Sequence, residues 1–239
     1  MKRINKLIIA NLVVLSIGII LFIGSMYMGG PTLEEGSRDI LVLAGEADEQ
    51  PGGSVDMAYM VHLENGSLSN FTPIYPGGKA HPTKAAPGGH GGNMLLHDCL
   101  WNGIDEGVEN AKEIVEYNTG MHADAVLIVR ADAADAIVDT IRPIYVDGVE
   151  TDLSAVDLIR SNDAYHGYAG NSKVTGTMSR NDAVMVLVKA VTKAMKDPKK
   201  KEKLINEAIN QYNQGNIIMR PEGSFIRLLS TKGLEQLTN

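Results

Sequence analysis

The residues best able to do chemistry in this sequence lie around a glycine-bearing break between two apolar segments. Residues 40–44 and 55–63 are mainly apolar, whereas residues 45–53 are polar and end in Gly52 and Gly53. Glycine allows backbone conformations in which amide groups face a ligand, and the carboxylate of Asp56 follows closely. We therefore expect this break to be the functional corner of the protein.

A second set of polar side chains lies in residues 76–92, whose many prolines and glycines predict a long loop. Loops of this length are usually functional or mobile. His81 and His90 lie within it, and His97 and Asp98 follow soon after. Imidazole and carboxylate groups are metal ligands, so His81 and His90 are candidate ligands, although their spacing matches no established zinc motif. Solvated loop histidines are the alternative.

Hydrophobic periodicity predicts the elements that would position these residues. Strands are expected over residues 40–44, 55–63, 68–75, 123–129 and 216–219, with turns at Asn65-Gly66 and Asp147-Gly148. Helices are expected over residues 102–118, from Asp132 until before Pro143, from Asp152 or Ser154 to Arg160, and over 183–195, 199–214 and parts of 221–237. The helix over 183–195 is apolar nearly all round and should be the most buried. This alternation implies an α/β (α+β) domain in which helices are layered on a sheet.

The N-terminus predicts a membrane anchor. Residues 7–28 are apolar and long enough as a helix to cross a bilayer, and basic residues precede them while acidic residues follow. We expect residues 1–6 as a cytoplasmic tip, 7–28 as a transmembrane signal anchor, 29–38 as a tether and 39–239 as an extracytoplasmic domain. A cleaved signal peptide is the alternative, but its apolar core is usually shorter than this one.

Composition limits the partners and covalent links that this chain can have. The net charge of −7 argues against a nucleic-acid partner, because phosphate backbones are bound through clustered lysines and arginines. The single cysteine, Cys99, excludes an intramolecular disulfide and is best explained as a small buried residue. Sequons at Asn65 and Asn70 fit an exposed chain outside the cell.

The local sequences resemble the LytR-CpsA-Psr superfamily of membrane-anchored, extracytoplasmic proteins, most closely a branch of unknown function. The resemblance covers most of residues 38–239 and is carried by residues 52–57 leading to 64–68, by 119–139 and by 215–219. It implies a single-pass transmembrane helix followed by one three-layer domain, with a central mixed β-sheet flanked by helices.

The resemblance also implies a site. In catalytic members, an Arg-Ser-Asp motif and further arginines hold a polyprenyl-linked pyrophosphate, and a divalent metal assists transfer of a phospho-glycopolymer to the cell wall. Residues 53–56 occupy the place of that motif and keep only Asp56, and the arginine after the second hairpin strand is missing. Asp56, Arg160 and Arg180 are therefore the expected catalytic residues, with Mg²⁺ at Asp56.

Further residues are expected to bind the pyrophosphate. Gly52, Gly53 and Ser54 lie at the motif, and Lys79 is a replacement for a missing arginine, although lysine lacks a bidentate fork.

Two functions follow from these expectations. One is a phosphotransferase or phosphate-ester hydrolase in the cell membrane, acting on polyprenyl-pyrophosphate-linked glycopolymer. The alternative is a non-catalytic module of the same fold, with a degenerate site, that binds envelope polymer or a protein. A third possible function is metal sensing by a loop that contains His81, His90 and His97.

Overall fold

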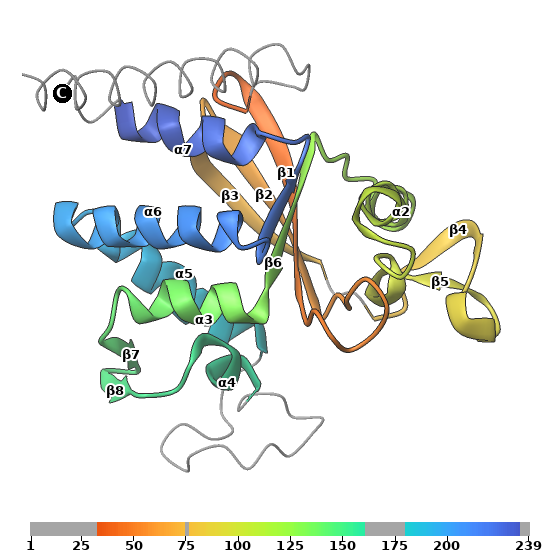
Figure 1. Ribbon diagram of the computed structural model, residues 1–239, viewed down its shortest axis with the longest axis horizontal. Coiled ribbons are helices and arrows are strands. Elements are labelled where there is room, and N and C mark those ends of the chain that lie inside the picture. Colours follow the sequence, from red (N-terminus) through yellow and green to blue (C-terminus); the bar gives the residue numbers. More distant parts are fainter. Residues whose placement is uncertain (1–32, 75–76, 161–179, 235–239) are drawn as a thin grey trace, which may run out of the picture.

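A five-stranded mixed sheet runs through the centre of the computed structural model, which describes residues 33–74, 77–160 and 180–234 (Figure 1). Its strand order is β3-β2-β1-β6-β9, and only the β1–β6 pair is parallel. The strands are β1 (Ser37–Gly45), β2 (Met57–Glu64), β3 (Ser67–Ile74), β6 (Ala125–Arg130) and β9 (Ile217–Arg220). All five were predicted, because each is rich in apolar or β-branched residues.

The predicted turns are present. Asn65 and Gly66 have φ values of 49° and 69° and join β2 to β3. Asp147 and Gly148 have φ values of 48° and 81° and join β7 (Ile144–Val146) to β8 (Val149–Thr151). Two consecutive residues with positive φ match the twist of a two-residue hairpin, which explains the Asn-Gly and Asp-Gly pairs.

One face of the sheet is covered by α2 (Ile104–Thr119). Alternate strand residues such as Leu41, Met60 and Val126 pack in one buried cluster with Ile114 and Val115 of this helix. Gly120 ends the helix in a left-handed conformation.

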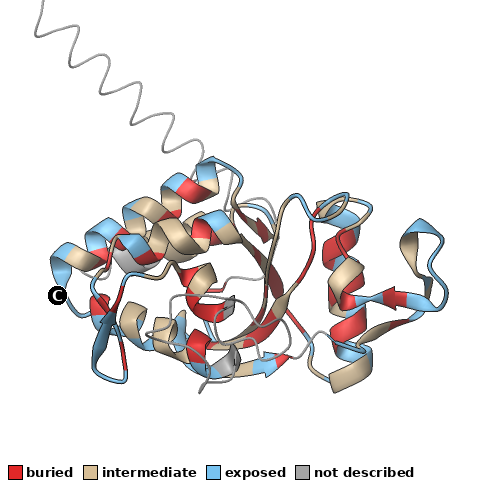
Figure 2. Ribbon diagram, turned by 90° about the horizontal axis from the view of Figure 1, so that it is seen from below, coloured by how far each residue is buried: buried red, intermediate tan, exposed pale blue. Residues whose placement is uncertain are grey.

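The opposite face is covered by several helices, so the domain has the predicted three layers (Figures 1 and 2). They are α3 (Ala131–Asp139), α4 (Ala155–Arg160), α5 (Arg180–Ala194), α6 (Pro198–Asn213) and α7 (Ser224–Leu234). Ile40 and Met219 from the strands pack with Ala133, Ala208 and Phe225 from α3, α6 and α7. Figure 2 shows the buried residues along the sheet and on the helix sides that face it.

The expectation of a single loop over residues 76–92 is wrong. Part of this segment is β4 (Ala80–Ala85), which pairs with β5 (Asn93–Leu95) in a separate two-stranded sheet beyond α2 (Figure 1). The side chain of Asn118 in α2 donates a hydrogen bond to the Ala80 carbonyl over 2.8 Å. The strand is fixed by backbone and polar contacts rather than by apolar alternation, so periodicity could not indicate it.

Two helix predictions also need correction. The helix expected from Asp132 begins one residue earlier, at Ala131, so Asp132 lies in its first turn, where a negative charge interacts favourably with the helix dipole. The helix α5 is not the most buried, because most of its described residues beyond Val184 are half-buried or exposed, whereas α2 has six buried positions. An open groove along α5, described below, accounts for this exposure.

The N-terminal predictions fall largely outside the described residues, including the anchor at 7–28 and the cytoplasmic tip at 1–6. Within the described ranges, no helix is both long and apolar enough to cross a bilayer. Leu33 is buried in the core and Ser37 already belongs to β1, so the folded domain starts earlier than the predicted boundary at residue 39.

The two edges of the central sheet are formed by β3 and β9. The strand β3 is exposed over residues 67–70 and contains an exposed proline, Pro73. The strand β9 has only four residues and is followed by Pro221.

Candidate functional site

The glycine-bearing break forms a compact loop between β1 and β2. The amide of Ser54 donates to the Glu46 carbonyl over 2.9 Å, and that of Asp56 donates to the Ala44 carbonyl over 2.9 Å. The Val55 amide donates to the His97 carbonyl over 3.0 Å, which attaches the loop to the segment after β5. Because these amides are used within the protein, the loop offers a ligand mainly its side chains.

The glycines at the break allow close packing of the backbone. Gly52 has φ +77°, and a side chain there would overlap the carbonyl of Leu100. Gly53 has φ +95°, and its Cβ would lie 2.9 Å from the Glu46 carbonyl oxygen. Both positions therefore require glycine for the shape of the loop.

Three side chains meet at this loop: Glu49, Asp56 and His97. One potential metal-ligand atom from each lies within 4.8 Å of the others. Glu49 is exposed, whereas Asp56 and His97 are half-buried. We call these three residues the loop cluster.

Neighbouring side chains orient the loop cluster. The hydroxyl of Ser54, which is only 3% exposed, donates to Glu49 Oε2 over 2.5 Å. His97 Nδ1 lies 2.8 Å from Asp98 Oδ1. A carboxylate can only accept, so Nδ1 carries a proton, and in the neutral ring Nε2 presents a lone pair, 3.8 Å from Glu49 Oε2.

Cys99 lies directly behind this cluster and is fully buried. Burial raises the pKa of its thiol well above the ordinary value, and the nearby charge of Asp98 adds to the effect. Cys99 is thus an inert core residue, as the sequence indicated.

The other candidate metal ligands from the sequence lie elsewhere. The ring of His81 is buried, with Nδ1 accepting from the amides of Thr83 and Lys84 and Nε2 lying 2.7 Å from Glu113 Oε2. His90 is exposed. Among the described residues, neither joins a group of three potential ligands.

Lys79 is half-buried just before β4, and its carbonyl accepts from the Leu96 amide over 2.8 Å. Its backbone therefore lies beside the segment that carries His97. Its expected role in ligand binding stays a prediction.

The backbone places the two predicted arginines near this end of the domain. Arg160 is the last residue of α4, and Arg180 is the first residue of α5. Leu158 of α4 and Ala183 of α5 share a buried cluster against which Met57, the residue after Asp56, is packed. The side chains of both arginines lie outside the described part of the structure, so their contact with Asp56 remains a prediction.

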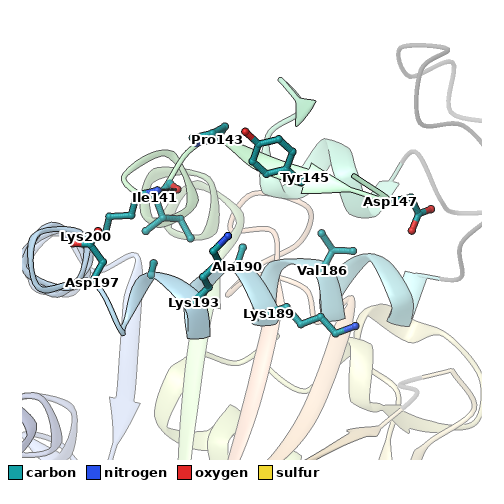
Figure 3. Close-up of a pocket in the computed structure, with 11 residues that line it drawn as sticks. Ile141, Pro143, Tyr145, Asp147, Val186, Lys189, Ala190, Lys193, Asp197 and Lys200 are labelled. Atoms are coloured by element: carbon teal, nitrogen blue, oxygen red, sulfur yellow. Dashed lines mark hydrogen bonds between the residues drawn. The ribbon is translucent and has the colours of Figure 1, made fainter. Parts of the chain in front are cut away.

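A groove of about 590 Å³ lies along α5, facing the segment that carries Pro143, Tyr145 and Asp147 (Figure 3). Ile141, Val186 and Ala190 contribute apolar lining, and Lys189 and Lys193 lie on its exposed side. The groove thus has an apolar surface with charged side chains of both signs, because Lys200, Asp147 and Asp197 also line it.

Sequence reasoning missed Glu49 and did not connect His97 with Asp56. His97 is 41 positions from Asp56, and its partner loop is polar and irregular, so no periodicity indicated the contact. The available signal was His97-Asp98, because a carboxylate beside a histidine is a common way to orient a metal-binding imidazole.

Solved structures with the same overall fold cover most of the chain. Protein gbs0355 from Streptococcus agalactiae is 13% identical with a TM-score of 0.53, covering 81% of this chain and 72% of that one. A protein described as a transcriptional regulator (EF0465) from Enterococcus faecalis is 12% identical with a TM-score of 0.52, covering 84% and 73%. The LytR-Csp2A-Psr enzyme from Actinomyces oris is 14% identical with a TM-score of 0.50, covering 85% and 76%.

These similarities define the class: the domain has the LytR-CpsA-Psr fold. More specifically, the chain belongs to the family described as protein of unknown function (DUF4012), whose model matches residues 35–165. Among curated proteins, none matches the sequence significantly.

Proposed function

We propose that this protein acts at the cell envelope, where it binds the phosphate groups of a lipid-linked glycopolymer and transfers or hydrolyses a phosphate ester. The observation that carries the proposal is the loop cluster, with Arg160 and Arg180 on the adjoining ends of α4 and α5. The fold shared with the LytR-Csp2A-Psr enzyme supports the same class of chemistry.

The residues of this site would have separate roles in binding and catalysis. Arg160 and Arg180 would hold phosphate oxygens through charge-assisted hydrogen bonds, which contribute on the order of 1.5–3 kcal/mol each. His97, oriented by Asp98, and the carboxylates of the loop cluster would together hold a divalent cation, for which the sequence suggested Mg²⁺ at Asp56. Such a cation would neutralise developing charge on the phosphate.

The groove along α5 supports a lipid-linked substrate. An apolar carrier would lie against Ile141, Val186 and Ala190, while Lys189 and Lys193 attract its anionic part.

Membrane anchoring is part of the same proposal. Residues 7–28 would hold the domain on the outer side of the cell membrane, with the N-terminus in the cytoplasm. Such an anchor would keep the domain close to lipid-borne substrates.

A binding assay with polyprenyl pyrophosphate tests the proposal on the full chain in detergent micelles. Arg160→Ala and Arg180→Ala should each weaken binding about tenfold, which corresponds to about 1.4 kcal/mol. Lys203→Ala, at an exposed position of α6, is the control and should bind like the wild type. Equal binding by all four proteins would refute the phosphate site.

A non-catalytic binding module is the second candidate, and the loss of the arginine from the catalytic motif favours it. When the Arg-Ser-Asp motif is aligned on Asp56, its arginine falls at Ser54, whose side chain is buried and donates to Glu49 instead. Binding of polyprenyl pyrophosphate without release or transfer of phosphate would support this candidate over the enzyme.

A further inference from the structure

We propose that the loop cluster is a binding site for a divalent transition metal of the Zn²⁺ type rather than a Mg²⁺ site. The role of the metal rests on the proposed function, but metal binding itself can be measured without any phosphate substrate. It depends on three ligands from two segments that are far apart in the sequence: Glu49 and Asp56 from the β1–β2 loop, and His97 from the segment after β5.

The spacing of the three side chains suits a shared ion. Nitrogen and oxygen ligands lie about 2.0–2.2 Å from such a metal, so their atoms stand about 3–4 Å apart around it. His97 Nε2 and Glu49 Oε2 are 3.8 Å apart, too far for a hydrogen bond but suitable for two ligands of one ion.

The neighbours of the cluster have the arrangement that metal sites use to fix their ligands. Asp98 accepts the Nδ1 proton of His97, so Nε2 of the neutral ring is left to bind an ion beside Glu49. Buried Ser54 donates to Glu49 and restrains it. Such outer partners fix the orientation of the ligands, and their mutation typically lowers metal affinity by about 10–100-fold.

The donor set decides between classes of metal. Magnesium prefers oxygen ligands and keeps several waters, whereas imidazole suits Zn²⁺ and other transition metals. A site with one imidazole and two carboxylates therefore discriminates against Mg²⁺. A bound cation also offsets the repulsion between the carboxylates of Glu49 and Asp56, which converge on the same imidazole.

The test uses Co²⁺ as the probe, because it adopts the same sites as Zn²⁺ and has visible absorption bands. The full chain is stripped with a chelator in detergent micelles and titrated with Co²⁺, following its absorption and the fluorescence of Trp101, the only tryptophan, four residues after His97. We expect saturable binding that Zn²⁺ displaces and that a hundredfold excess of Mg²⁺ does not.

Matched histidine variants locate the site. His97→Gln and Glu49→Gln should weaken Co²⁺ binding at least tenfold, while His90→Gln, at an exposed histidine outside the cluster, should leave it unchanged. Urea unfolding of each variant verifies that the fold is retained. The inference is overturned if His97→Gln binds Co²⁺ like the wild type, or if Mg²⁺ competes as well as Zn²⁺.

The metal-binding result can be interpreted whether or not the protein is an enzyme. Metal binding that requires His97, found together with no phosphate-ester turnover, would support this inference and contradict the enzymatic proposal. Phosphate-ester turnover without His97-dependent metal binding would support the enzymatic proposal and contradict this inference.

Discussion

Replacing Gly52 by alanine tests whether close backbone packing fixes the loop that carries Glu49 and Asp56. Gly52 has φ +77°, and an added Cβ would lie 1.9 Å from the Leu100 carbonyl oxygen, whereas an ordinary contact begins near 3.4 Å. The loop and Leu100 would have to separate by about 1.5 Å. The left-handed backbone costs alanine about 1–2 kcal/mol, and repacking adds about 1–3 kcal/mol. We expect the free energy of unfolding to fall by about 2–5 kcal/mol.

A matched glycine separates the two contributions. Gly120 has φ +74°, and an added Cβ there would meet no atom within 4 Å, so Gly120→Ala carries the conformational cost alone, about 1–2 kcal/mol. Urea unfolding followed by circular dichroism gives both free energies. Equal losses in the two variants would refute the argument that Gly52 is fixed by its contact with Leu100.

Cys99, His62 and Asp197 provide smaller tests. Because burial raises the pKa of the Cys99 thiol, a maleimide should label the native chain slowly at about pH 8 and quickly in urea, and fast native labelling would contradict this. Hydrogen bonds to Asp39 and then to Glu64 raise the pKa of His62 above its ordinary 6.5, so the stability they contribute is complete below about pH 6.5 and is lost as the pH rises through the folded value. His62→Gln should therefore lower the urea midpoint more at about pH 5.5 than at about pH 9, and an equal effect at both would exclude the charged pair. The Asp197 side chain accepts two backbone amides in the first turn of α6, so Asp197→Ala should cost about 1 kcal/mol and Asp197→Asn much less, with equal losses arguing against a capping role.

Most of the sheet could be predicted from sequence because its signals are local. The strand β6 is a continuous apolar run, as expected for a central strand covered on both faces. Asn65-Gly66 and Gly120 mark a turn and a helix end through positive φ, which few other residues tolerate. The strand β4 has no such local signal, since the sheet β4–β5 is held by contacts with α2 that lie more than 20 residues away in sequence.

The candidate site could be predicted only in part, for the same reason. Asp56 was indicated by its place beside two glycines, but Glu49 resembled any solvated acid of a polar loop. His97 seemed to belong with the histidines of the preceding segment, yet the fold brings it to Asp56 through the bond between its carbonyl and the Val55 amide. Long-range backbone pairing of this kind leaves no periodic pattern in the sequence.

The edges of the central sheet have a consequence for assembly. An exposed strand edge can recruit a strand from another chain, which leads to aggregation or to peptide binding by strand addition. Here Pro73 removes a donor from β3, and the four-residue β9 is followed by Pro221. Crowded copies of the domain should therefore stay separate, and a peptide partner would have to enter through a groove or a loop rather than by extending the sheet.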